Sequence, residues 1–411
     1  MTKKIMFVLL LGVALLAVAC GPAATPTAVP PTAAPPTAVP AAATPTKAPV
    51  PTTAPVVPTV PAAPTAPAAS SMDALIKAAQ AEGQLTIVAV PDDWLNYGVA
   101  KANFQKKYGI KLNDLDPNAG SADEINYVKT NKDSKGPQNP DVLDVGFAFG
   151  PQLKTEDLCL PYKVSTFDTI PNDLKDPNGC WFGDYYGVFS FTVNKSVVKN
   201  VPQDWSDLLK PEYKNSVAIA GDPLASNQAQ QSIYAASLAN GGSLTDASKG
   251  LDFFAQLAKA GNFVPLVGGQ GSLAKGETPI LITWDYLGLG YKDILKGNPD
   301  LEVVVPKSSV FGGVYVMSIS KYAPHPNAAK LWVEYLYSDE GQLIWLSGYG
   351  HPIRYNDLAK RNVIPADLAK KLPSAELYAK ATFPTGQQVA DARKFIGDNW
   401  DKIVGVKVNK P

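Results

Sequence analysis

Hydrophobic and polar positions alternate along the chain in blocks that predict strands and helices in turn. Short β-branched runs ended by Pro or Gly are typical of buried strands, and apolar positions spaced three and four apart are typical of amphipathic helices. The first series predicts strand, helix, strand, helix and strand at residues 84–90, 99–109, 111–114, 121–132 and 140–148. Gly109 marks the end of the first helix, and Ser121 with Glu124 forms a pair like a capping box at the start of the second.

A second series repeats this order further along the chain. Strands and helices are predicted at residues 216–221, 227–240, 244–261, 279–286 and 301–306. The β-rich segments 185–198 and 312–320 are interpreted as crossings between two lobes. We therefore predict an α/β fold of two lobes, each with a central, mostly parallel sheet flanked by helices. The expected boundaries are 71–187 with 312–411 for lobe 1 and its C-terminal helices, and 188–311 for lobe 2.

The first residues carry the pattern of an export signal. Two lysines precede an apolar run at residues 5–19, which is short for a bilayer-spanning helix of about 20 residues. Ala17 and Ala19 lie just before Cys20 and resemble the lipobox of bacterial lipoproteins. The resemblance implies a signal peptide at 1–19, removed before a lipid-anchored Cys20. An ordinary signal with an incidental cysteine is the alternative.

Residues 20–70 are dominated by Pro, Thr, Ala and Val, with almost no aromatic or charged side chains. Such a composition can neither bury a core nor sustain a helix, so a semi-rigid tether is expected. An O-glycosylated stalk is a compatible reading because the segment is rich in Thr. Both readings place the protein outside the cytoplasm, at the outer face of the cell membrane.

Charge limits the classes of binding partner, and cysteine content bears on a disulfide. The 37 basic and 37 acidic residues balance, so nothing overall favours nucleic acid or an anionic membrane surface as a partner. With Cys20 lipidated, Cys159 and Cys180 remain, and in an oxidising compartment they could form a disulfide. Two buried free thiols are the alternative that the sequence leaves open.

Two long segments resemble one known family. Residues 201–223, which contain Trp205, Asp207 and an Asp-Pro after a strand, and residues 325–354 resemble extracellular solute-binding proteins. The similarity extends over most of the chain from about Met72. It is closest to the branch that includes polyamine, ferric-ion, thiamine and phosphonate binders.

This resemblance implies a type II periplasmic-binding-protein fold that closes around a small solute by a hinge motion. The closed form would be recognised by an ABC permease in the membrane, and no cofactor is implied. A monomer is expected. The motifs identify the family well and the ligand poorly.

An amine or polyamine-like cation is the first ligand class that the residues suggest. Ligands of open α/β sheets bind outside the carboxyl ends of the strands, where carboxylates and aromatic rings would suit an organic cation. The candidate cation-binding residues are Asp92, Trp94, Tyr97, Trp284, Asp285 and Tyr286. Core packing of the rings and a solvated turn at Asp92 are the alternatives.

An anion or zwitterion such as a phosphonate is the second class. Backbone N–H groups and hydroxyls at two expected helix starts could bind it, at Gly120, Ser121, Asp222, Ser226 and Asn227. The same residues also serve as ordinary N-caps. Tyr315, at the second crossing, is a further candidate ligand-binding residue. Ferric ion fits less well, because ferric binders often carry adjacent tyrosines after the second crossing and only Tyr315 stands there.

Enzyme motifs are absent from the sequence. It contains no G-x-S-x-G elbow, no H-E-x-x-H helix and no P-loop, so neither a catalytic nor a metal-binding set is assigned. Two acids such as Asp92 and Asp285 could in principle serve a secreted lipoprotein hydrolase. A surface adhesin, which would need an exposed apolar patch, is a third class.

Overall fold

The structure is a computed structural model that describes residues 69–372 and 375–410. The expected signal peptide and Cys20 lie outside the described residues, as does the expected tether except for its last two residues. There α1 already begins, at Ala69. No helix in the described part of the chain is both long and apolar enough to cross a bilayer.

The N-terminal part of the first lobe follows the predicted order. Its strands are β1 (Gln84–Val88), β2 (Lys111–Leu115) and β3 (Val142–Gly146), and its helices are α1 (Ala69–Glu82), α2 (Tyr97–Tyr108), α3 (Ser121–Asn131) and α4 (Phe149–Thr155). Strands β1 and β2 pair in parallel. Helix α2 ends at Gly109, whose φ of 71° is the left-handed conformation that favours glycine.

Helix α3 begins differently from the predicted capping pair. Its N-cap is Gly120, and the Asp123 carboxylate accepts a hydrogen bond from the Gly120 N–H at 2.9 Å. Ser121 instead accepts from the Gly146 N–H, and Glu124 from the Asp144 N–H. Both side chains therefore point toward β3, because the first turn of α3 packs on the end of that strand.

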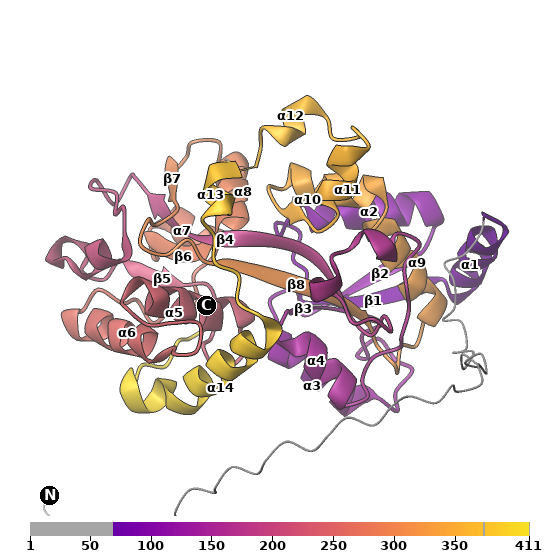
Figure 1. The fold of residues 1–411 in the computed structure, drawn as a ribbon, viewed down its shortest axis with the longest axis horizontal. Helices are drawn as coiled ribbons and strands as arrows, with labels where there is room; N and C mark the ends of the chain where they lie inside the picture. Colours follow the sequence, from indigo (N-terminus) through magenta and orange to yellow (C-terminus); the bar gives the residue numbers. More distant parts are fainter. Residues whose placement is uncertain (1–68, 373–374, 411) are drawn as a thin grey trace, which may run out of the picture. The chain divides into compact units, whose positions relative to one another are not determined.

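Two long strands join the lobes. The first crossing is β4 (Phe182–Asn194), reached through the short 3-10 turns η1 (Phe167–Thr169) and η2 (Asn172–Leu174), and the second is β8 (Gly312–Ile319). They pair with each other in antiparallel, and in Figure 1 they run side by side through the middle of the sheet. The strand order is β3-β8-β4-β6-β5, in which only β5 and β6 pair in parallel. The sheet is thus mixed instead of mostly parallel, because the crossing strands run against their neighbours.

The second lobe lies between the crossings. Its strands are β5 (Val217–Ile219), β6 (Ile280–Trp284) and β7 (Leu301–Val304), with α5 (Asn227–Ala239), α6 (Ser248–Ala260), α7 (Gln270–Lys275), α8 (Asp285–Leu295) and the turns η3 (Trp205–Leu209) and η4 (Pro211–Tyr213). Trp205, one of the residues that carries the family resemblance, is buried between the rings of Phe191 and Phe253.

The C-terminal segment returns to both lobes. It contains α9 (Pro326–Leu336), α10 (Asp339–Ser347), β9 (His351–Pro352), α11 (Tyr355–Lys360), α12 (Ala366–Ala369), α13 (Ala375–Ala379) and α14 (Gly386–Ile403). Helix α9 packs on α1, whereas α14 packs on α5 and α6 (Figure 1). The expected assignment of all of 312–411 to lobe 1 therefore does not hold for α14. Its buried Trp400 contacts Phe254 and Phe263, which belong to the core of lobe 2.

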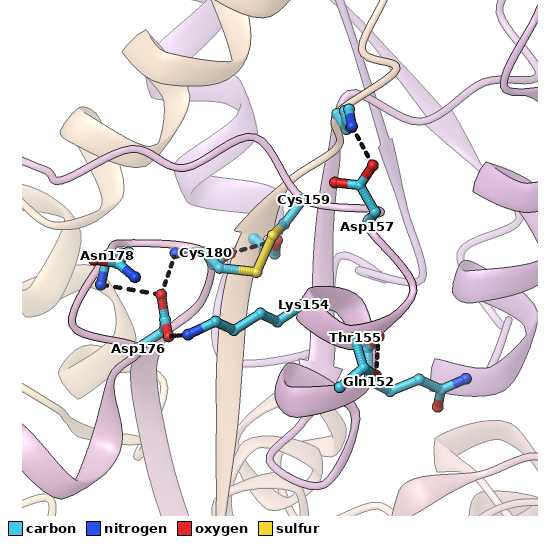
Figure 2. The surroundings of a disulfide bond; sticks show 10 residues. Gln152, Lys154, Thr155, Asp157, Cys159, Asp176, Asn178 and Cys180 are labelled. Atoms are coloured by element: carbon cyan, nitrogen blue, oxygen red, sulfur yellow. Dashed lines mark hydrogen bonds and ion pairs between the residues drawn. A yellow bond between two sulfur atoms is a disulfide. The ribbon is translucent and has the colours of Figure 1, made fainter.

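Cys159 and Cys180 form a disulfide (Figure 2), with their Cα atoms 5.4 Å apart. Cys159 follows α4, and Cys180 lies shortly before the first crossing strand, separated from it by Trp181. Beside the bridge, Lys154 forms an ion pair with Asp176, and the Asp176 carboxylate accepts a hydrogen bond from the Cys180 N–H at 3.2 Å. The bridge therefore fastens the long loop that leads into β4, and the pairing that the sequence left open is present.

Candidate functional site

A cavity of about 690 Å³ lies between the two lobes. On the side of lobe 1 it is lined by the loops that follow β1 and β2, by the first turn of α3 and by Asp144 of β3. On the side of lobe 2 it is lined by the loop after β5, by α7 and the residues before it, and by α8. The cavity thus lies at the carboxyl ends of the strands β1, β2, β3 and β5, where ligands of α/β sheets are expected.

The structure brings about half of the sequence-predicted site residues to this cavity. Its lining includes Trp94, Gly120, Ser121, Asp222, Ser226, Asn227 and Tyr315. The lining does not include Asp92, Tyr97, Trp284, Asp285 or Tyr286. Four of the last five, all except Asp92, are almost completely enclosed by protein and have no surface facing the cavity.

Asp92 is the exposed exception. Its carboxylate forms an ion pair with Lys101 at 2.5 Å, while the Asp92 side chain remains 80% exposed. The Lys101 ammonium also contacts Asp114 at 2.6 Å. Asp92 is therefore turned toward a lysine on α2, whereas its neighbours Pro91, Asp93 and Trp94 line the cavity.

Asp285 faces the first crossing strand. One of its carboxylate oxygens accepts a hydrogen bond from the Val188 N–H at 3.0 Å, and the other accepts from the Tyr378 hydroxyl at 3.1 Å. Burial raises the pKa of Asp285 to about 7. Its role as a cation anchor remains a sequence-based prediction to which this geometry adds no support.

Aromatic rings form one wall of the site. Trp94 meets Tyr315 edge to face at 5.5 Å, and Tyr185 stacks on Tyr315 at 5.5 Å. The Trp94 indole N–H donates to the Tyr185 hydroxyl at 2.8 Å. Trp284 and Tyr286 stack behind this wall with ring centroids 6.1 Å apart. The predicted residues Trp94, Trp284, Tyr286 and Tyr315 are thus collected in one cluster, of which Trp94 and Tyr315 reach the cavity together with Tyr185. Tyr97 instead packs its ring on Trp332 and Trp345.

Asp144 at the base of the cavity was missed by the sequence analysis. It lies in the middle of β3, where it accepts hydrogen bonds from the Tyr97 hydroxyl at 2.6 Å and from the Tyr185 hydroxyl at 3.0 Å. A single acid within an otherwise apolar buried strand was the available signal. The pattern alone could not show that this side chain borders the cavity.

Two further acids surround Asp144. The Glu124 carboxylate accepts from the Asp144 N–H at 3.0 Å, and Asp184 lies within hydrogen-bonding reach of the Asp144 carboxyl group. Burial raises the pKa of Asp144 to about 6 and holds the pKa values of Glu124 and Asp184 well above their usual range. In the described residues, no lysine or arginine forms an ion pair with any of these three carboxyl groups. The base of the cavity is therefore acidic and lacks a positive counter-charge.

The rest of the lining is acidic as well. It contributes the carboxyl groups of Asp93, Asp116, Asp123, Asp222 and Glu277. Against these stand Lys275 and Lys410, each near a rim carboxylate: 4.0 Å from Glu277 and 3.9 Å from Asp123, respectively. A cationic group entering the cavity would therefore meet a field of favourable sign.

The two lobes contact each other where α3 and α5 begin. The Ala122 N–H points to the Ala225 carbonyl oxygen at 3.5 Å. A Cβ atom on Gly146 would lie 2.0 Å from Cγ of Asn227, so only glycine allows this approach. The Ser226 hydroxyl accepts from the Ala229 N–H at 3.3 Å, which is an ordinary N-cap contact. Asn227 is almost fully buried, and its amide nitrogen finds no acceptor at hydrogen-bonding geometry, although the Tyr315 hydroxyl lies nearby.

Comparison with known proteins agrees with this architecture. A family model described as bacterial extracellular solute-binding protein matches residues 138–379. An uncharacterized protein of Haemophilus influenzae is 30% identical over 313 residues, which is 70% of this chain and 83% of that protein. A putative 2-aminoethylphosphonate-binding periplasmic protein of Salmonella typhimurium is 23% identical over 320 residues, which is 75% of this chain and 87% of that protein.

The fold also has solved neighbours. The periplasmic binding protein AfuA from Actinobacillus pleuropneumoniae, with fructose-6-phosphate bound, superposes with a TM-score of 0.61 at 22% identity. The match covers 79% of this chain and 99% of that one. The predicted α/β fold of the type II periplasmic binding proteins is therefore confirmed.

Proposed function

Because this chain belongs to the bacterial extracellular solute-binding proteins, we propose that it captures a small amine-bearing solute in the interlobe cavity. Members of the family act outside the cytoplasm, bind a small solute and deliver it to an ABC permease. The solute proposed here carries an ammonium group, as a polyamine does. Hinge closure through the crossings β4 and β8 would complete the site, since both lobes contribute to its lining.

The observation that carries the proposal is the group of buried carboxyls at Asp144 without a positive partner. A buried carboxylate is costly unless it is paired and hydrogen-bonded, and here the hydrogen bonds are present while the counter-charge is missing. An ammonium group of the solute would supply that charge. The faces of Trp94, Tyr185 and Tyr315 would add a cation–π attraction of about 0.5–2 kcal/mol.

A zwitterion is the second candidate. The starts of α3 and α5 face the same cavity, so a compact anionic group could lie near Ser121 and Ser226 while the ammonium group lies at Asp144. The similarity to a putative aminoethylphosphonate-binding protein supports this variant. Several of the N–H and hydroxyl groups there already have partners within the protein, which favours the amine end as the main determinant.

Export and anchoring complete the proposal. The signal-like residues 1–19 and the lipobox-like residues before Cys20 support a lipoprotein held at the outer face of the cell membrane by its tether. A monomer would suffice, because one chain supplies both walls of the cavity.

Replacing Asp144 tests the anchor. Asp144→Asn keeps the shape of the side chain and an acceptor for one of the two tyrosine hydroxyls, but it removes the charge. We expect amine affinity to fall by more than about tenfold, since a charged hydrogen bond is worth about 1.5–3 kcal/mol. Isothermal titration with putrescine measures the change.

Asp252→Asn is the matched control, because Asp252 is half exposed, forms an ion pair with Lys249 and lies outside the cavity. It removes the same charge from the protein and should leave affinity unchanged. Equal putrescine affinity in Asp144→Asn and the wild type would remove Asp144 from the site.

A further inference from the structure

Asp184 is a buried acid that has no contact with the cavity. It lies on β4 next to Tyr185, where the register with β8 shifts between Gly183 and Tyr186. One carboxylate oxygen accepts from the Tyr185 N–H at 2.6 Å. The other oxygen, Oδ2, meets no donor from the protein, although the residue is completely buried. An acceptor in this position is satisfied only if it carries a proton itself.

The Asp144 carboxyl is a group able to receive that proton. Asp184 and Asp144 are hydrogen-bonding partners, so one of the two must be the donor. Tyr97 and Tyr185 already donate to Asp144, which therefore acts as the acceptor. The arrangement is a carboxyl–carboxylate pair with a single shared proton.

We propose that Asp184 is a positioning residue for solute capture: its carboxyl group donates a proton to Asp144, so that the pair presents one oriented negative charge to the cavity. The inference rests on the proposed function and specifies its chemistry. The site would hold a single ammonium group at its base, and Asp184 would act only through Asp144.

The surroundings of the pair support one retained proton. The groups that face it are Glu124 on α3, the phenols Tyr97 on α2, Tyr185 on β4 and Tyr286 on α8, and Tyr315 and Tyr337. None of these groups can carry a positive charge. Burial raises the pKa of both acids, and the Asp144 charge raises that of Asp184 further. Two ionised carboxylates are therefore disfavoured before the solute arrives.

The pair predicts a two-sided pH dependence of affinity. When pH falls through about 6, the pair takes up a second proton at Asp144 and the charge facing the solute is lost. At higher pH Asp184 loses its proton, the pair gains a second negative charge, and cation affinity rises. A primary amine keeps its charge over this range because its pKa is about 10.

The test compares the wild type with Asp184→Asn, using putrescine from about pH 5 to about pH 9, where buried carboxyls can titrate. The asparagine amide can donate the same hydrogen bond but cannot ionise. We expect the acid decline of affinity to remain in the variant and the alkaline rise to disappear. Two profiles of identical shape, one uniformly weaker, would mean that Asp184 is merely structural and would overturn the proposal.

Two further measurements keep the inference testable if the variant misfolds or putrescine does not bind. In the wild type, calorimetry in two buffers of different ionisation enthalpy counts released protons, and we expect release that grows as the pH approaches about 6 from above. No release at any pH would overturn the proposal.

Infrared spectroscopy of the ligand-free protein tests the pair alone. The carbonyl stretch of a protonated carboxyl should lose intensity in Asp184→Asn at neutral pH. A spectrum unchanged by the substitution would refute the shared proton, whereas a lost band without amine binding would refute only the proposed function.

Discussion

At the scale of single residues, burial decides what a carboxyl group can do. Asp285 and Asp144 are both enclosed and both hydrogen-bonded, yet only Asp144 borders the cavity. Asp285 instead joins the start of α8 to Val188 and Tyr378. The sequence suggested a carboxylate beside aromatic rings, and the structure provides one, but on β3 instead of α8.

The raised pKa of Asp285 predicts a pH-dependent cost to stability. The unfolded chain ionises Asp285 near its ordinary pKa, about 3.9, while the folded chain resists ionisation up to about 7. The unfolded state therefore binds fewer protons between these values, and stability falls as pH rises through this window.

Asp285→Asn removes that titration. The free energy of unfolding of the variant minus that of the wild type should therefore increase by about 2 kcal/mol when the pH is raised from about 5 to about 7. Urea denaturation at both pH values measures the difference. Using the difference between the two proteins cancels the contributions of Glu124, Asp144 and Asp184. A difference that does not change with pH would contradict the assigned burial of the charge.

At the scale of elements, the disulfide fixes the approach to the first crossing. The bridge closes a loop between residues 21 positions apart, and such a loop is expected to restrict the unfolded chain. Loss of the bridge should therefore lower the free energy of unfolding by about 3 kcal/mol. The double variant Cys159→Ser, Cys180→Ser, compared with the wild type by urea denaturation, measures this cost.

Reductant provides the control for the disulfide. It should destabilise the wild type to the level of the double variant and leave the variant itself unchanged. Equal stability of the oxidised wild type and the variant would show that the bridge adds nothing.

Strand and helix order was predictable because each element carries its own periodicity. The runs at 84–90 and 140–148 became β1 and β3, and Gly109 ends α2 as expected. That periodicity does not specify which strands pair with each other or which helices pack together. The antiparallel crossings and the docking of α14 on lobe 2 depend on contacts between distant segments. For the same reason the loops of the site were found, while the orientation of Asp144 was not.

At the scale of the whole molecule, the two lobes share one acidic cavity crossed at its edge by β4 and β8. Lobe 1 supplies Trp94 and the Asp144 carboxyl group at the bottom of the cavity, and lobe 2 supplies the starts of α5 and α7. A solute that contacts both lobes would stabilise the closed arrangement, and one that contacts a single lobe would not. The account therefore predicts that binding and stabilisation of the fold occur together.

The most direct test of the amine proposal is a thermal-shift panel on the purified full chain. It should contain putrescine, spermidine, thiamine, 2-aminoethylphosphonate, phosphate, amino acids, sugars and ferric citrate. A ligand at about 100 times its Kd stabilises by about 2.7 kcal/mol, which is a shift of several degrees. We predict that amine-bearing solutes raise the Tm and that phosphate and sugars do not. A shift with phosphate or a sugar and none with any amine would contradict the account.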